Sequence, residues 1–193
     1  DALRELRTQN DLKLRVIAYL DGNAAFETLT STDLPRGDAD ERLTVGGVRF
    51  RLDGAIVLHD AALLEAYAGA TDERGQLLLP DELLVSRLSQ VVRRGLQPVF
   101  ETQGDRASRV ALDLLDRVSA VEGDLVALRP RLESVVCVAT KDWPRFPALG
   151  VVSSMQPAVL RAEFESYANA LGETRWHGVA AWRALVPALG RAV

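Results

Sequence analysis

Hydrophobic and polar positions along this chain follow two different periods, and the changes between them predict separate strands and helices. Period-two alternation is clearest in Val48–Leu52, where apolar side chains take one face and two arginines the other. Other β-branched or apolar runs, bounded by glycine, proline or aspartate, indicate further strands. The predicted strands span residues 13–20, 48–52, 97–101, 132–138 and 150–155.

Helical spacing of apolar residues fills the stretches between these strands. Pro80 opens one helix and Gly95 ends it, while Gly104 precedes another in which Asp105 favours the N-terminus. Shorter helices are expected at residues 1–7, 143–149, 158–171 and 178–189. Strands that alternate with helices are typical of βαβ units, so we predict an α/β fold with mostly parallel strands.

The length sets a limit on this fold. A chain of 193 residues fits one domain, since domains commonly have about 100–200 residues. A closed eight-stranded barrel usually needs about 250 residues. We therefore predict that residues 1–193 form one partial or distorted TIM-type (β/α) barrel segment. Uncovered strand edges in such a segment favour self-association into a homo-oligomer.

Composition excludes several classes of protein. The chain has 23 Lys and Arg against 27 Asp and Glu, a net charge of −4, which argues against a nucleic-acid binder. No apolar run reaches the roughly 18–20 residues of a membrane span, so we expect no membrane partner. A single cysteine, Cys137, excludes an internal disulfide and suits a reducing cytoplasm. The excess of arginine over lysine is typical of a GC-rich bacterial genome.

Several motifs carry a more specific signal. These are Val45–Gly54, Gly104–Ala107, Arg131–Glu133, Asp142–Pro157 and Trp182–Leu185. In sequence and in spacing they resemble the amidohydrolase superfamily, in its amidohydrolase-3 branch. The resemblance implies a distorted β/α barrel that holds zinc or another divalent metal at the C-terminal ends of its strands. Such a metal activates water for attack on an amide or related C–N bond.

The chain departs from this family at the positions that would bind metal. By the resemblance, Arg49 stands in place of a lysine, and Glu101 and Ser134 each stand in place of a histidine. The family's first strand, with its His-x-His pair, and its last strand, with an aspartate, have no apparent counterpart. Arginine stays protonated and does not coordinate cations. We therefore predict no metal cofactor and treat Arg49, Asp53, Glu101 and Ser134 as vestigial positions.

Three of these positions allow alternative interpretations. Arg49 and Glu101 are expected to face each other, so an ion pair could replace the metal contact, or both groups could be solvated. Asp53 is either a remnant of substrate handling or, as we favour, a cap of the turn with Gly54.

The remaining candidates have simpler interpretations. His59 and His177 match no ligand position, and we expect a surface or hydrogen-bonding role for the first and packing for the second. Cys137 is expected to be buried in the middle of a strand, as a small hydrophobic residue.

These observations predict a catalytically inactive relative of metal-dependent C–N hydrolases. Two alternatives stay open. One is a non-catalytic binding or assembly module that uses an exposed sheet edge or the vestigial cleft, with an unidentified small-molecule ligand. The other is an active hydrolase completed by segments outside this chain, which stoichiometric zinc, manganese or iron would reveal.

Overall fold

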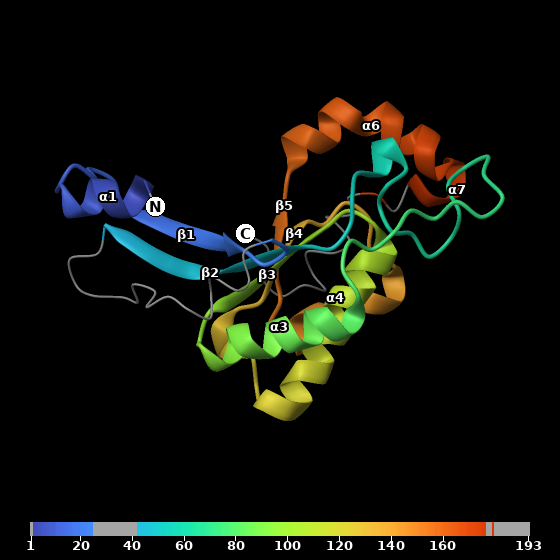
Figure 1. The fold of residues 1–193 in the computed structure, drawn as a ribbon. Coiled ribbons are helices and arrows are strands. Elements are labelled where there is room, and N and C mark those ends of the chain that lie inside the picture. The colour runs from blue at the N-terminus through green and yellow to red at the C-terminus, as the bar shows by residue number, and fades with distance from the viewer. Residues whose placement is uncertain (1, 25–41, 177–178, 180–193) are drawn as a thin grey trace.

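A five-stranded parallel sheet forms the centre of the computed structural model, which describes residues 2–24, 42–176 and 179 (Figure 1). The strands lie side by side in chain order, and all four pairings are parallel. Their bounds are β1 (Val16–Asp21), β2 (Leu43–Arg51), β3 (Gln97–Thr102), β4 (Arg131–Ser134) and β5 (Val152–Met155). This arrangement confirms the predicted α/β class and the partial barrel.

The strands differ from their predicted bounds by one to five residues at one or both ends, and the largest differences are in β2 and β4. β2 begins earlier than expected, because Leu43 already pairs with Val16 of β1. β4 is shorter than the predicted strand 132–138, since Ser134 and Val135 have φ values of 71° and 41°. These left-handed conformations end the extended backbone. Cys137 therefore lies in the connection after β4, and the prediction of a mid-strand cysteine was wrong.

The described helices fall at predicted positions, except for the last, Glu173–Trp176, which was not predicted. They are α1 (Ala2–Thr8), α3 (Asp81–Arg93), α4 (Asp105–Glu122), α5 (Arg145–Ala148), α6 (Pro157–Leu171) and α7 (Glu173–Trp176). Short 3₁₀ turns are η1 (Ile56–Leu58), η2 (Val126–Leu128) and η3 (Thr140–Asp142). The helix predicted over residues 178–189 lies outside the described residues. In the described ranges, no helix combines the length and apolarity that a membrane crossing would need.

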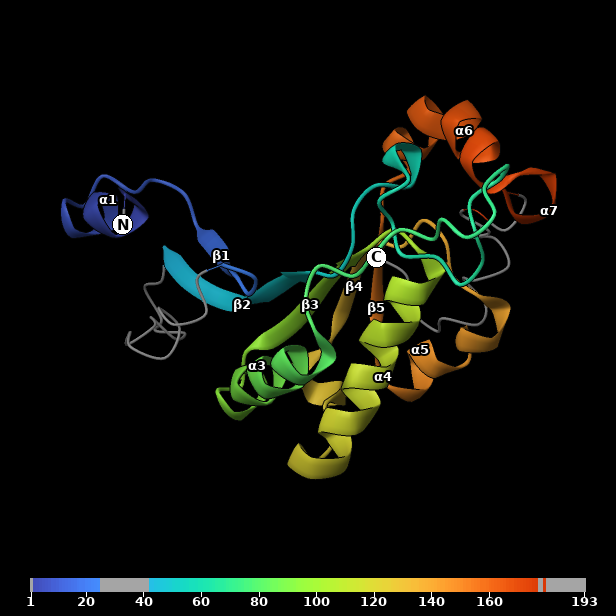
Figure 2. The ribbon, with the colours of Figure 1, turned by 45° about the vertical axis from the view of Figure 1, so that its right-hand side comes forward.

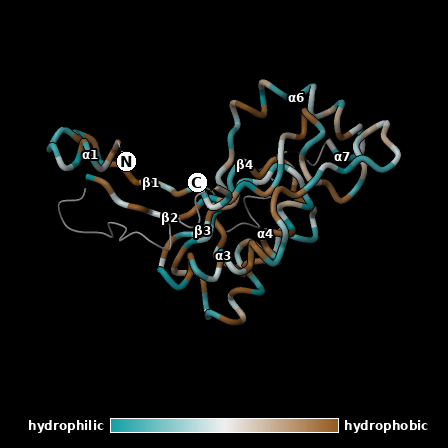
Figure 3. Tube along the Cα trace, viewed as in Figure 1, coloured by the Kyte–Doolittle hydropathy of each residue, from teal (hydrophilic) through white to brown (hydrophobic). Residues whose placement is uncertain are grey.

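The main core lies between the sheet and helices α3 and α4, which cover the same face (Figures 1 and 2). Val48, Phe50 and Leu52 are fully buried there, as their alternation with arginine predicted. The Phe50 and Phe100 rings stack across β2 and β3 with centroids 5.8 Å apart. Along α3 and α4 the chain alternates between hydrophobic and hydrophilic positions, as expected for helices with one buried side (Figure 3).

A second apolar cluster lies near the C-terminal ends of the strands. Residues of the connection after β2, including Ile56, Leu63 and Tyr67, pack there against Tyr167 and Leu171 of α6. Through this cluster α6 packs against the long connection at that end of the sheet (Figure 1). Polar and charged side chains occupy the sheet face opposite α3 and α4.

The N-terminal halves of β1 and β2 extend beyond the rest of the sheet as a two-stranded ribbon (Figure 2). Gly47 is the first residue of β2 that pairs with β3. α1 lies at the far end of this ribbon. β1 is an edge strand, and Ile17 on it is 66% exposed. An apolar edge strand of this kind is open to pairing with another chain.

Candidate functional site

The centre of the polar sheet face is occupied by Arg49. Its Nη2 lies 2.5 Å from Oε2 of Glu101 on β3, and its Nε donates a hydrogen bond of 3.0 Å to Oε2 of Glu133 on β4. Strand register explains this convergence, because Glu101 pairs with Glu133 and with Arg51, one pleat beyond Arg49. The predicted ion pair between Arg49 and Glu101 is therefore confirmed.

Two further arginines extend this group into a network. Nε of Arg51 lies 3.2 Å from Oε2 of Glu101, and Nη2 of Arg131 lies 2.7 Å from Oε1 of Glu133. Each carboxylate is thus held by two guanidinium groups. We call Arg49, Arg51, Glu101, Arg131 and Glu133 the arginine–glutamate network. The Arg49 side chain is 40% exposed, and Glu101 and Glu133 are 22% and 21% exposed.

Glu133 was not singled out from the sequence, although a signal for it was present. Arg131 and Glu133 are two residues apart on one short strand, so they share a face. The family resemblance instead implies a ligand position at Ser134, at the end of that strand. The alternation of the strand would have placed Glu133 beside Glu101.

Arg131, at the start of β4, also contacts Tyr19 of β1. The Arg131 guanidinium lies over the Tyr19 ring, 4.6 Å from its centroid. The Tyr19 hydroxyl donates a 2.6 Å hydrogen bond to Oε1 of Gln97. Arg131 is thus held both by the Tyr19 ring and by Glu133.

Asp53 follows directly after β2, but its role differs from the turn cap that we expected. Its carboxylate is buried and accepts backbone N–H groups from Ala62, Gln103 and Gly104, at 3.0, 3.0 and 2.8 Å. It therefore joins the end of β2 to the long connection and to the start of α4. Burial raises the pKa of the Asp53 carboxyl to about 7, although the three backbone hydrogen bonds act in the opposite direction.

Ser134 is buried at the end of β4 and does not join the arginine–glutamate network through any bond among the described residues. It lines a small hollow beneath α6, together with Gln103, Gln156 and Tyr167. Its left-handed backbone turns the chain at this point. Among the described residues, Ser134 therefore makes no hydrogen bond to Arg49 or Glu101.

His59 and Cys137, the two described candidates outside the strands, form no hydrogen bond or ion pair with the arginine–glutamate network among the described residues. The His59 ring stacks on Tyr67 at 4.3 Å, and its Nδ1 lies 3.5 Å from Oε2 of Glu73. Cys137 is buried, and burial raises the pKa of its thiol to about 12. A thiol with so high a pKa is a poor nucleophile at neutral pH. His177 lies outside the described residues.

The residues of the network do not fit a divalent metal. A cation needs neutral or anionic donors, and Arg49 presents a permanent positive charge between the two nearest carboxylates. Within the described ranges, no three His, Cys, Asp or Glu side chains are grouped so that they could hold a metal ion. No reaction step through a metal follows from this arrangement.

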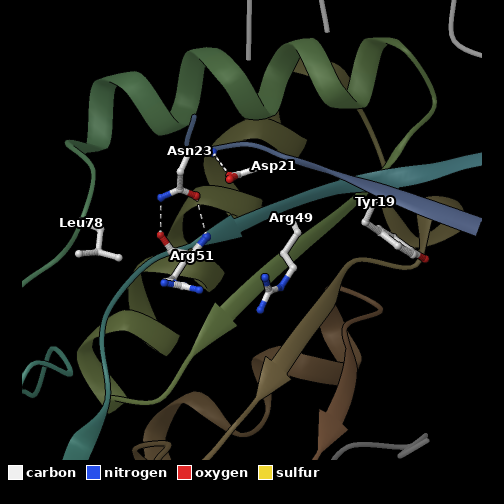
Figure 4. Close-up of a pocket in the computed structure, with 6 residues that line it drawn as sticks. All are labelled: Tyr19, Asp21, Asn23, Arg49, Arg51 and Leu78. Carbon is white, nitrogen blue, oxygen red and sulfur yellow. Dashed lines mark hydrogen bonds between the residues drawn. The ribbon is translucent and has the colours of Figure 1, made fainter. Parts of the chain in front are cut away.

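A hollow of about 270 Å³ lies beside the network, over the C-terminal halves of β1 and β2 (Figure 4). Its lining is formed by Tyr19, Asp21, Asn23, Arg49, Arg51 and Leu78. Arg49 and Arg51 both point into it from β2, and Leu78 and Tyr19 lie at opposite ends (Figure 4). The hollow is therefore a place on this face where a small molecule could meet guanidinium groups.

Similarity to known proteins agrees with this fold. In Arabidopsis thaliana, Protein LONG AFTER FAR-RED 3 is 31% identical over 151 residues, which cover 78% of this chain and 26% of that protein. Two solved structures are uncharacterized metal-dependent hydrolases, both 26% identical to this chain. The one from Pyrococcus furiosus has a TM-score of 0.82 over 96% of this chain and 37% of its own. The one from Pyrococcus horikoshii OT3 has a TM-score of 0.84 over 99% and 37%.

The chain thus spans about a quarter of the length of its plant relative and a little over a third of each archaeal hydrolase. The profile of the amidohydrolase family matches residues 1–188. That match includes every strand described above and the whole arginine–glutamate network. Together with the parallel sheet and the structural neighbours, it shows that this chain belongs to the amidohydrolase family, in its amidohydrolase-3 branch.

Proposed function

We propose that this chain is a non-catalytic member of the amidohydrolase family, in which an arginine–glutamate network occupies the place of a metal centre. One observation carries the proposal: the Arg49 guanidinium lies between Glu101 and Glu133 and bonds to both. A divalent cation at this point would have to displace the Arg49 guanidinium, whose charge Glu101 and Glu133 already neutralise. It would also lie against a guanidinium that cannot lose its proton.

The substitutions support one another. Arg49 in place of a lysine would be repelled by a metal, while Glu101 in place of a histidine supplies the charge that stabilises Arg49. An arginine and a glutamate introduced together neutralise each other, whereas either alone would keep only one of its two ion-pair partners. The pair therefore stabilises the barrel interior in place of metal ligation.

A non-catalytic role leaves binding or assembly as the activity of the chain. The exposed edge of β1 supports self-association, and the hollow beside Arg49 and Arg51 supports small-molecule binding. A cytoplasmic location suits the single buried cysteine. Hydrolysis of a C–N bond by this chain would require metal ligands that its described residues do not provide.

The proposal is tested by the metal content of protein produced in medium supplemented with zinc and manganese. We expect less than about 0.1 metal ion per chain, since carboxylates held by arginines compete poorly as ligands. A matched variant, Arg49→Lys with Glu101→His and Ser134→His, returns the donor types that the resemblance implies. We expect it to retain more zinc than the wild type. One or more ions per wild-type chain, lost on substitution of Glu101 by Gln, would overturn the proposal.

A further inference from the structure

The hollow beside the network presents hydrogen-bond donors that have no partner in the part of the chain that the structure describes. Among the described residues, Nη1 and Nη2 of Arg51 have no partner, and the same holds for Nη1 of Arg49. Both guanidinium groups line the hollow. Two unused nitrogens at the end of one guanidinium form the fork that binds a carboxylate with two parallel hydrogen bonds.

The same guanidinium groups are held from behind. Oε2 of Glu101 accepts from Arg49 Nη2 and from Arg51 Nε, and Glu133 accepts from Arg49 Nε. These bonds use Nε of both arginines and Nη2 of Arg49. Both guanidinium groups line the hollow with their remaining nitrogens (Figure 4). Because the arginines are already oriented, a ligand does not have to bear the full cost of ordering them.

The rim of the hollow is also fixed. Asn23 forms two hydrogen bonds of 2.8 Å with the backbone of Arg51, one through its amide nitrogen and one through its amide oxygen (Figure 4). Arg87 of α3 donates to the carbonyl oxygens of Gly22 and Asn23, at 2.6 and 2.9 Å. The turn after β1 is thus tied to both β2 and α3, which gives the hollow a defined shape.

We infer that this hollow binds a small organic monocarboxylate, with the carboxylate on Arg51 and Arg49 and the apolar part between Leu78 and Tyr19. This inference rests on the proposed function, because a metal-free site leaves the guanidinium groups as the binding groups. The volume of about 270 Å³ suits a ligand of about ten non-hydrogen atoms.

The local charge selects a monoanion over a more highly charged group. The positive charges of Arg49, Arg51 and Arg131 are balanced by Glu101, Glu133 and Asp21. A single carboxylate uses the free fork without adding strong repulsion. A phosphate dianion would bring a second negative charge close to Asp21 at the rim and to Glu101 behind the arginines.

Benzoate is a suitable probe, and its binding can be followed by ¹H–¹⁵N NMR titration of the whole chain at pH 7. We expect saturable shifts at Asn23, Arg49, Arg51 and Leu78, with a Kd of about 1 mM. Arg51→Gln should weaken binding about tenfold, and Arg51→Lys should weaken it too, since lysine keeps the charge but lacks the fork. Arg74→Gln, at an exposed arginine paired with Asp72, is the matched control and should leave the Kd unchanged.

Three results would overturn the inference. They are no saturable shifts up to about 20 mM benzoate, equal affinity in folded Arg51→Gln protein, and tighter binding of inorganic phosphate than of benzoate. Repeating the benzoate titration with EDTA distinguishes failure of this inference from failure of the proposed function. Benzoate binding that disappears with EDTA and returns with zinc would overturn both. Failure to bind in protein shown to be metal-free would overturn the ligand assignment alone.

Discussion

Replacing Arg49 by methionine removes the central charge of the arginine–glutamate network while keeping an unbranched side chain in place of the aliphatic part of arginine. Glu101 and Glu133 then face each other across neighbouring strands, where like charges destabilise a sheet. Each keeps one arginine, since Arg51 still reaches Glu101 and Arg131 still reaches Glu133. The loss is therefore partial.

The structure sets the expected magnitude of this effect. Exposed ion pairs contribute about 0.2–1 kcal/mol, and breaking a fully buried pair costs about 3–5 kcal/mol. Arg49 is 40% exposed and its two partners are just over 20% exposed, so the network lies between these limits. We expect Arg49→Met to lower the free energy of unfolding by about 2 kcal/mol at pH 7 and low salt.

A double-mutant cycle isolates the interaction from other effects of the substitution. Urea unfolding of the wild type, Arg49→Met, Glu101→Gln and the double variant should give a coupling energy of about 1 kcal/mol. The exposed pair of Arg74 and Asp72, 3.1 Å apart, supplies the control cycle, with an expected coupling below about 0.5 kcal/mol. A coupling for Arg49 and Glu101 no larger than the control, or a gain of stability in Arg49→Met, would refute the reasoning.

Three further predictions concern burial, packing and association. Burial raises the Asp53 pKa to about 7 from an ordinary value near 3.8, so the folded state holds this proton more tightly than the unfolded state. The stability of the wild type should therefore fall relative to Asp53→Asn, by about 3 kcal/mol, as pH rises from 4 to 7. Parallel pH profiles of the two proteins would contradict this. Gly104→Ala would place a methyl group against the Ala62 carbonyl oxygen and the Asp53 carboxylate, so it should lower the free energy of unfolding by about 2–3 kcal/mol in chemical denaturation. Gly69→Ala is the control, because its added methyl meets nothing within 4 Å and only the positive φ is unfavourable. It should cost about 1 kcal/mol. Ile17→Lys on the exposed edge of β1 should shift the protein toward monomer in sedimentation velocity if β1 edges pair, and an unchanged distribution of an associated wild type would exclude this edge.

Much of the fold follows from local patterns in the sequence. The alternation of Val48–Leu52 fixed which face of β2 is buried, and helix boundaries near Pro80 and Gly104 followed from their backbone preferences. The length of β4 could not be predicted, because its end depends on the left-handed backbone at Ser134 and Val135. These are residue types that rarely adopt such φ values, so tertiary contacts determine the turn.

The site was predictable only in part. The pairing of Arg49 with Glu101 could be foreseen, since strand order and resemblance placed both on one face. The three backbone partners of Asp53 could not, because they come from segments 9 to 51 residues away. The hollow likewise depends on how Asn23 closes onto the backbone of β2, 28 residues later. Such long-range contacts leave no local pattern in the sequence.

Zinc titration of the wild-type chain by calorimetry at pH 7, with Glu101→Gln beside it, measures directly whether the network excludes a cation. The arginine–glutamate network predicts no binding with a Kd below about 10 µM, and identical heats for the two proteins. Stoichiometric binding in the submicromolar range that is lost in Glu101→Gln would contradict it, because Glu101 would then be a metal ligand and not the partner of Arg49.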